Sequence, residues 1–306
     1  DDTTNSSVIL SRRGFMELPQ ELWKVANRRP IRILDLSYNF LASEDILPLS
    51  DDDENHKKAQ AAAMKQASSS PSNSLSPAKP EHQGSSNRLY SSNAGWGGAG
   101  GFVPTPKPKL RSLEVLYLSS NRLDSIPDEF FVLTGIRHLW LNNNQLSEVP
   151  ADVSKLERLQ VLSLSGNLIA RLEPQIGALL NLQQLLLRDN KLGLQEGVVH
   201  LPEHLGLLTN LQVLDLGKNL LNTLPIELGR LLPTIQRLNL EGNSWRFPSA
   251  GITDQGREPT LRYLAEFYEE KLSRYRVRAK ERIRLLRDHP DALGLTRSEA
   301  NDILAG

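Results

Sequence analysis

One short segment has residues of the types and spacing that hydrolytic metal chemistry uses. Residues 200–204 read His-Leu-Pro-Glu-His, a spacing typical of zinc proteases in which two imidazoles hold the ion and a glutamate activates water. That chemistry needs both histidines on one face of a helix, and Pro202 interrupts a helix there. The other histidines show no ligand spacing. We therefore expect neither a metal site nor a cofactor.

Other catalytic patterns are also missing from the sequence. The glycine-rich run at residues 95–101 is not followed by Lys-Ser or Lys-Thr, as a phosphate-binding loop would be. The absence of cysteine from all 306 residues excludes a cysteine nucleophile and a cysteine-ligated metal. With 36 basic and 36 acidic side chains, the surface as a whole does not attract nucleic acid. The sequence predicts a protein that is not an enzyme.

The elements that position these residues follow a repeating frame, L-x-x-L-x-L-x-x-N-x-L. Successive asparagines from Asn121 to Asn190 lie 23 residues apart. An incomplete first copy precedes the others at Val8, Leu10 and Phe15. An apolar residue followed by proline recurs after several of the asparagines, and Leu201-Pro202 of the histidine segment is one such pair. The asparagine positions are Asn39, Asn121, Asn144, Asn167, Asn190, Asn219 and Asn243.

This frame predicts an α/β leucine-rich-repeat solenoid of about eight coils. The L-x-L segment of each coil is expected to form a short strand, and the strands stack into a parallel sheet on the concave side. The leucines around each strand point into a core shared with the next coil. The asparagine amide is expected to be buried and to satisfy backbone groups of neighbouring coils.

A long insertion separates the first full repeat from the others. Residues 50–109 contain 11 Ser, 6 Pro and 6 Gly, a composition that cannot bury enough apolar surface to offset the entropy of ordering. We expect a disordered low-complexity region, with a transient helix at residues 56–67. The predicted organisation is therefore N-terminal repeats (1–49), the insertion (50–109) and the main repeats (110–256).

The C-terminal part is expected to cap the solenoid. Residues 257–289 have apolar residues at helical spacing, which predicts a long helix that ends near His289-Pro290. The first half of this helix should seal the last coil, whose apolar face would otherwise be open to solvent. Thr296 and Glu299 fit a capping box, so residues 290–306 should form a short helix or tail.

The repeats resemble the typical 23-residue class of intracellular leucine-rich-repeat proteins, and they are similar to the Ras-group and scribble-like members. The ending around Asn243, Pro248, Gly256 and Leu264 also resembles the terminal repeat and helix of that group. The resemblance covers residues 8–49 and 110–265. It implies a scaffold without catalytic activity whose protein partner is a small GTPase, a phosphatase or a polarity protein. The insertion departs from the group.

A binding surface can be mapped because strand side chains alternate between the two faces of a sheet. The position between the two strand leucines should face the concave side in every coil, and it brings Tyr117, Trp140 and Leu186 into one column, with Ser163 leaving a dip beside the indole. Exposed aromatics flanked by polar groups are typical of a protein-binding hot spot. The predicted partner-binding residues are Tyr117, Trp140, Leu186, His138, Asn142, Asn143, Arg188, Asp189 and Asp215.

The stretch Lys271–Arg287 carries eight basic residues and one acidic residue, a net charge of +7. It is either a solvated helix face or a site for an acidic partner, anionic lipid or RNA, and nucleic acid ranks lowest because aromatic platforms for bases are lacking. A regulatory or targeting part of a larger enzyme is a further alternative. No stretch is apolar enough to cross a membrane and no leader is evident, so we expect a cytoplasmic monomer whose peripheral membrane contact is left open.

Overall fold

The computed structural model describes residues 7–26, 28–46, 110, 112–194 and 200–305, which lie in a unit formed by residues 1–51 and 108–306. The predicted insertion, with its helix at residues 56–67, lies outside the described residues.

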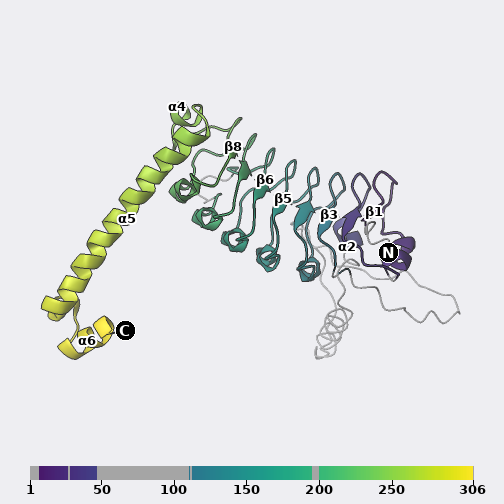
Figure 1. Cartoon of the computed structure of the whole chain (residues 1–306). Coiled ribbons are helices and arrows are strands. Elements are labelled where there is room, and N and C mark those ends of the chain that lie inside the picture. The colour runs from purple at the N-terminus through teal and green to yellow at the C-terminus, as the bar shows by residue number, and fades with distance from the viewer. Residues whose placement is uncertain (1–6, 27, 47–109, 111, 195–199, 306) are drawn as a thin grey trace, which may run out of the picture. The chain divides into compact units, whose positions relative to one another are not determined.

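Eight short parallel strands form one sheet, in which each strand pairs with its neighbours in chain order (Figure 1). Even the incomplete first repeat contributes a strand, although Arg13 replaces the asparagine of the frame. The predicted α/β leucine-rich-repeat solenoid is therefore confirmed. The strands are β1 (Ser7–Ile9), β2 (Ile33–Asp35), β3 (Val115–Tyr117), β4 (His138–Trp140), β5 (Val161–Ser163), β6 (Gln184–Leu186), β7 (Val213–Asp215) and β8 (Arg237–Asn239).

Short helices cross the side of the coils opposite the sheet (Figure 1). Most follow a proline, which cannot donate a backbone hydrogen bond and suits the start of a helical turn. These helices are α1 (Gln20–Ala26), α2 (Ser43–Ile46), η2 (Asp128–Val132), η3 (Ala151–Lys155), η4 (Pro174–Ala178), η5 (Glu203–Leu207) and η6 (Ile226–Leu231). The leucines between sheet and helices are buried and form one continuous core.

The asparagines of the frame tie neighbouring coils together. Asn167 is representative: its amide nitrogen donates to the carbonyl of Leu164 in its own coil and to that of Leu141 in the coil before. Its amide oxygen accepts from the backbone N–H of Leu146. Equivalent bonds occur at the other six positions, of which only Asn243, in the last coil, is half-buried rather than buried.

The C-terminal region begins with α4 (Ala250–Thr253) and continues in α5 (Arg257–Asp288), η7 (Pro290–Leu293) and α6 (Arg297–Ala305). Leu261 and Leu264 of α5 are buried in the core of the coils. Gly229 of η6 permits this docking, because a Cβ at that position would collide with the backbone of Ala265. The helix therefore packs on η6 in the place where another coil would otherwise stack.

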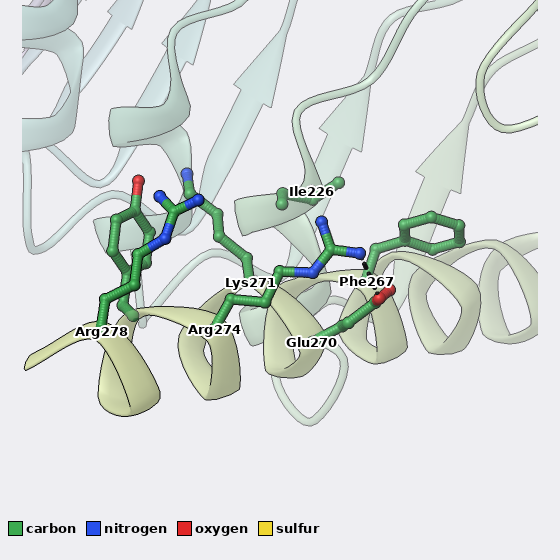
Figure 2. Close-up of a pocket in the computed structure, with 7 residues that line it drawn as sticks. Ile226, Phe267, Glu270, Lys271, Arg274 and Arg278 are labelled. Atoms are coloured by element: carbon green, nitrogen blue, oxygen red, sulfur yellow. Dashed lines mark hydrogen bonds and ion pairs between the residues drawn. The ribbon is translucent and has the colours of Figure 1, made fainter. Parts of the chain in front are cut away.

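An ion-pair cluster fastens α5 to two coils. The Lys271 ammonium lies 2.7 Å from Glu227 of η6 and 3.5 Å from Glu203 of η5. The hydrogen bond to Glu227 raises the pKa of Lys271. Figure 2 shows Lys271 on the side of α5 that faces the coil carrying Ile226.

At the C-terminal end of the region, the side chains of Thr296 and Glu299 form the predicted capping box at the start of α6. The backbone N–H of Thr296 donates to the Glu299 carboxylate, and the backbone N–H of Glu299 donates to the Thr296 hydroxyl.

Candidate functional site

The strand register aligns the predicted hot-spot residues across the sheet. Tyr117 pairs with Trp140, Trp140 with Ser163, and Ser163 with Leu186, so all four lie in one row that crosses β3 to β6. The rings of Tyr117 and Trp140 stack with their centroids 6.0 Å apart and an interplanar angle of 21°. Both rings and Leu186 are half-buried, while the middle leucines of the same strands are buried. Each of these three large side chains therefore keeps part of its surface on the sheet face.

A second apolar row widens this surface. Val115, Val161 and Val213 stand on the same face of the sheet in a row two residues before the first, which also contains His138 and Gln184. Sequence reasoning missed the valines, although strand alternation was sufficient to place them. We define the sheet-face patch as Val115, Tyr117, His138, Trp140, Asn142, Val161, Ser163 and Leu186.

The expected dip at Ser163 is wrong. Ser163 is only 1% exposed, because it lies between the larger side chains of Trp140 and Leu186 on the neighbouring strands. Trp140, Ser163 and Leu186 therefore form a nearly closed surface in the unbound protein.

Three residues of the sheet-face patch have buried polar atoms without hydrogen-bond partners among the described residues. Among the described residues, four buried side-chain polar atoms lack a hydrogen bond, and three of them are Trp140 Nε1, Asn142 Oδ1 and Ser163 Oγ. An unpaired buried polar group costs about 1–3 kcal/mol, so native structures rarely keep several together. Together the three atoms offer a donor, an acceptor and a hydroxyl that can serve as either.

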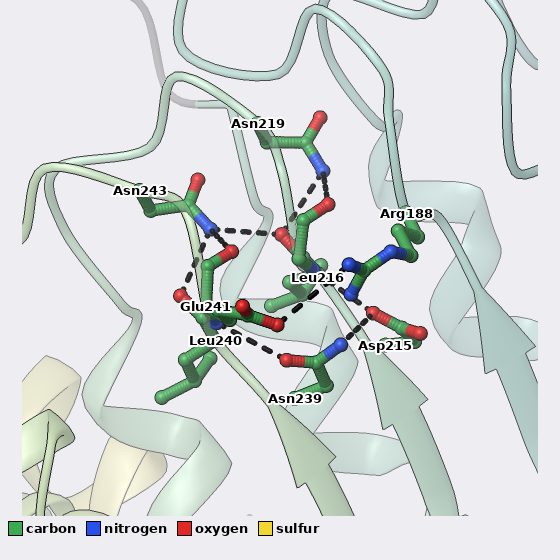
Figure 3. Close-up of polar contacts among 9 residues, drawn as sticks. Arg188, Asp215, Leu216, Asn219, Asn239, Leu240, Glu241 and Asn243 are labelled. Atoms are coloured by element: carbon green, nitrogen blue, oxygen red, sulfur yellow. Dashed lines mark hydrogen bonds and ion pairs between the residues drawn. The ribbon is translucent and has the colours of Figure 1, made fainter.

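Beyond Leu186 the row that contains Trp140 continues with Asp215 and Asn239, whose polar groups bind one another (Figure 3). The Asp215 carboxylate accepts hydrogen bonds of 2.9 Å from the backbone N–H of Gly217 and from the amide of Asn239. The Arg188 guanidinium lies 3.6 Å from Glu241, and its side chain is one-third exposed. Asp215 is thus engaged in holding the end of its strand, whereas Arg188 keeps part of its donor capacity for a partner.

Two of the predicted polar flanking residues serve the turns of the solenoid. Asn143 and Asp189 immediately precede the frame asparagines and have backbone φ angles of 54° and 57°. Every coil has a positive φ at this position, with glycine in only two of the eight coils. Asparagine and aspartate adopt this conformation more easily than most residues, which accounts for their presence. Both side chains are exposed at the end of the strand.

The histidine segment lacks the single helix that the zinc-protease spacing requires. Pro202 caps η5, so His200 precedes the helix and His204 lies within it. The Nδ1 atom of His200 lies 3.2 Å from the carbonyl oxygen of Ala170, and Glu203 binds Lys271. The part of the chain that the structure describes has no group of three side chains able to hold a metal ion.

The comparisons with known proteins agree with the repeat frame. The family described as "Leucine rich repeat" matches residues 111–169, which include the coils of Tyr117, Trp140 and Ser163. No curated protein matches this sequence. With eight parallel strands, the fold is that of a leucine-rich-repeat protein.

Two solved structures are similar to this chain at low sequence identity. The ectodomain of the plant membrane receptor kinase GASSHO1/SCHENGEN3 from Arabidopsis thaliana, in complex with CASPARIAN STRIP INTEGRITY FACTOR 2, is 22% identical with a TM-score of 0.45, over 75% of this chain and 20% of that one. A leucine-rich-repeat protein of Leptospira interrogans is 24% identical with a TM-score of 0.41, over 78% of this chain and 55% of that one. The chain thus spans from a fifth to about half of their lengths.

None of the described helices has the length and apolar character to cross a membrane.

Proposed function

We propose that this protein is a non-catalytic interaction scaffold that binds a protein partner on the sheet-face patch. The observation that carries the proposal is the row of Tyr117, Trp140 and Leu186, three large side chains in register on adjacent or next-adjacent strands. These three side chains do not belong to the hydrophobic core, which is filled by the middle leucines of the same strands. Tryptophan and tyrosine are enriched among the residues that dominate binding energy.

The unpaired polar atoms support the same surface. A partner that displaces the indole of Trp140 slightly can offer a backbone carbonyl to Nε1 and an N–H to Asn142 Oδ1. These bonds would satisfy side-chain atoms that have no hydrogen-bond partner within the protein, so they favour the bound state. Arg188, His138, Asn143 and Asp189 are proposed to contact the rim of the partner.

The cellular setting is proposed from the resemblance in the repeats. We infer a cytoplasmic, monomeric protein in intracellular signalling, with a small GTPase, a phosphatase or a polarity protein as its partner. The repeat class and the ending after Asn243 support this inference, as does the absence of cysteine.

Affinity capture followed by mass spectrometry tests the proposal. Wild-type protein is compared with Trp140→Ala and with the control Leu180→Ala, whose side chain is 54% exposed and lies outside the patch. We expect Trp140→Ala to lose a partner that the control retains. A partner retained by Trp140→Ala at full affinity would show that the patch is not the binding site.

A further inference from the structure

A second surface lies between α5 and the coils on which it packs. A pocket of about 370 Å³ opens there, lined by Ile226 of η6 and by a strip of α5. In Figure 2 the side chains of Lys271, Arg274 and Arg278 extend from α5 toward the coil that carries Ile226. The α5 residues of this pocket are Phe267, Glu270, Lys271, Arg274, Tyr275 and Arg278.

The walls of the pocket are held in place in the unbound protein. Leu261 and Leu264 anchor α5 in the core, Gly229 sets its distance from η6, and Lys271 joins it to Glu203 and Glu227. A site with fixed walls loses little conformational freedom on binding, which favours affinity.

The charges of the pocket are unequally satisfied. Lys271 binds the two glutamates of the coils, and Arg274 donates to Glu270 in a contact of 2.6 Å. Arg278 makes no hydrogen bond or ion pair within the described residues, and it is exposed. The Arg278 guanidinium lies in the same pocket as Lys271 and Arg274 and is not paired with a carboxylate. Its charge therefore leaves a local excess of positive charge in this pocket.

Apolar surface stands directly beside this charge. Phe267 is 37% exposed and Tyr275 is 56% exposed, and Ile226 closes the opposite wall. A neighbouring pocket of about 380 Å³ shares Lys271 and Tyr275 with the first. Its other walls include Tyr268 of α5, Arg230 of η6, and the glutamates Glu203 and Glu227 that Lys271 binds. We define the α5 groove as these two pockets together.

We propose that the α5 groove binds an acidic peptide segment of a partner protein that carries an aromatic or branched apolar side chain. The apolar side chain contacts Ile226, Phe267 and Tyr275, and a neighbouring carboxylate accepts hydrogen bonds from Arg278 and Arg274. Charge complementarity selects an acidic ligand, because the unpaired cation faces the groove. The groove shape favours a peptide, because a narrow segment can contact Ile226 of η6 and the side chains of α5 at the same time, whereas a flat bilayer would contact the outer side chains of α5 alone.

This site is independent of the sheet-face patch, since no residue belongs to both.

The test uses the whole chain and a short fluorescein-labelled peptide in which glutamates flank one phenylalanine, with fluorescence anisotropy as the readout. The groove variant is Arg274→Glu with Arg278→Glu. Its charge-matched control is Arg276→Glu with Lys280→Glu, two exposed residues of α5 that do not line either pocket.

We expect the groove variant to bind the peptide about tenfold or more weakly, and the control to change affinity by less than about threefold. Tyr275→Ala should also weaken binding of the phenylalanine peptide but not of a counterpart with serine in its place. All variants should keep the wild-type melting temperature, since these side chains are exposed.

Equal losses in the groove variant and in the control would overturn the proposal, because the helix would then act as a uniform positive surface. Preferential binding to anionic phospholipid vesicles, with the same loss in both double variants, would assign the segment to a membrane instead. Wild-type protein that does not bind the peptide at low salt would also overturn it. The affinity capture with Trp140→Ala tests the sheet-face patch alone. Its result therefore neither supports nor contradicts peptide binding in the α5 groove.

Discussion

Leu139 and Trp140 are neighbours in the chain, yet their side chains lie on opposite faces of β4. Leu139 is 1% exposed and belongs to the core, while Trp140 is half-buried and stacks on Tyr117. The same difference between adjacent positions recurs in β2, β3, β6 and β7, because strand side chains alternate, whereas in β5 both Leu162 and Ser163 are buried. Function and stability are therefore separable at single residues.

Trp140→Ala tests this separation directly. We expect the variant to bind its protein partner roughly 30-fold more weakly, about 2 kcal/mol, because an indole at the centre of an interface is lost. Its free energy of unfolding should fall by much less than the roughly 2–5 kcal/mol expected for Leu139→Ala. Partner affinity is measured by calorimetry and stability by denaturant titration. A Trp140→Ala protein that unfolds would show that the strand register is wrong.

The asparagines that join the coils should be more sensitive to substitution than their polar character suggests. Asn167→Ala leaves the backbone N–H of Leu146 without a partner, and it removes one of the two amide hydrogen bonds accepted by each of two buried carbonyls, which keep those from Asn144 and Asn190. We expect a loss of about 1–3 kcal/mol in the free energy of unfolding, because a buried backbone N–H is left unpaired. The control is Asn181→Ala, which removes one exposed bond to the carbonyl of Glu157 and should cost less than about 1 kcal/mol. Similar costs for both variants would contradict the role of the buried bonds.

At the scale of elements, the position of α5 depends on a residue with no side chain. Gly177, Gly206 and Gly229 stand at equivalent positions of η4, η5 and η6, and each meets backbone that a Cβ would strike. At Gly177 and Gly206 the contacting backbone belongs to the next coil, and at Gly229 it belongs to α5. Close approach of backbones thus explains both coil stacking and helix docking.

Gly229→Ala should displace α5 from the last coil. We expect a fall of about 1–3 kcal/mol in the free energy of unfolding, together with faster hydrogen exchange in residues 257–272. The matched control is Gly251→Ala in α4, where the nearest atom lies 4.0 Å from an added Cβ. A thermal shift assay on both variants checks the prediction, and an unchanged melting temperature for Gly229→Ala would contradict it.

The basic half of α5 is expected to be secondary for the sheet-face partner. Replacing Arg276, Arg278, Arg282 and Arg284 by glutamate reverses the charge of the segment, but these exposed residues are not part of the patch. We expect the affinity for the sheet-face partner to change by less than about threefold at physiological salt, because charges beyond the Debye length are screened. Loss of that partner from a folded variant would make the basic segment the principal site.

At the scale of the whole molecule, coils separated by the insertion pair directly. Ile33, Leu34 and Asp35 of β2 are in register with Val115, Leu116 and Tyr117 of β3. The Ser43 hydroxyl donates to Asp124 at 2.7 Å, and Arg32 binds Glu114 at 2.7 Å. The hydrogen bond from Arg32 lowers the pKa of Glu114, although an ion pair this exposed stabilises little. These contacts between the two flanking coils are made by residues outside the insertion.

Replacement of residues 52–107 by a short Gly/Ser linker should leave the fold intact. We expect the melting temperature to fall by less than about 5 °C, because the contacts between the flanking coils are retained and loop closure costs little more for a long loop than for a short one. Differential scanning calorimetry of the two proteins gives the comparison. A larger fall would mean that the insertion contributes to the stability of the coils.

The periodic features of this protein could be read from the sequence. The spacing of the leucines and asparagines was enough to predict eight coils, the strand positions and the row of Tyr117, Trp140 and Leu186, because each coil repeats one local geometry. Tertiary structure alone decided the rest, since it depends on contacts between segments distant in the chain. Only the coordinates show that Ser163 is covered by its neighbours, that Asp215 binds Gly217 and Asn239, and that Gly229 admits α5. The α5 groove likewise exists only because the helix packs on η6, an arrangement of two surfaces that no local pattern encodes.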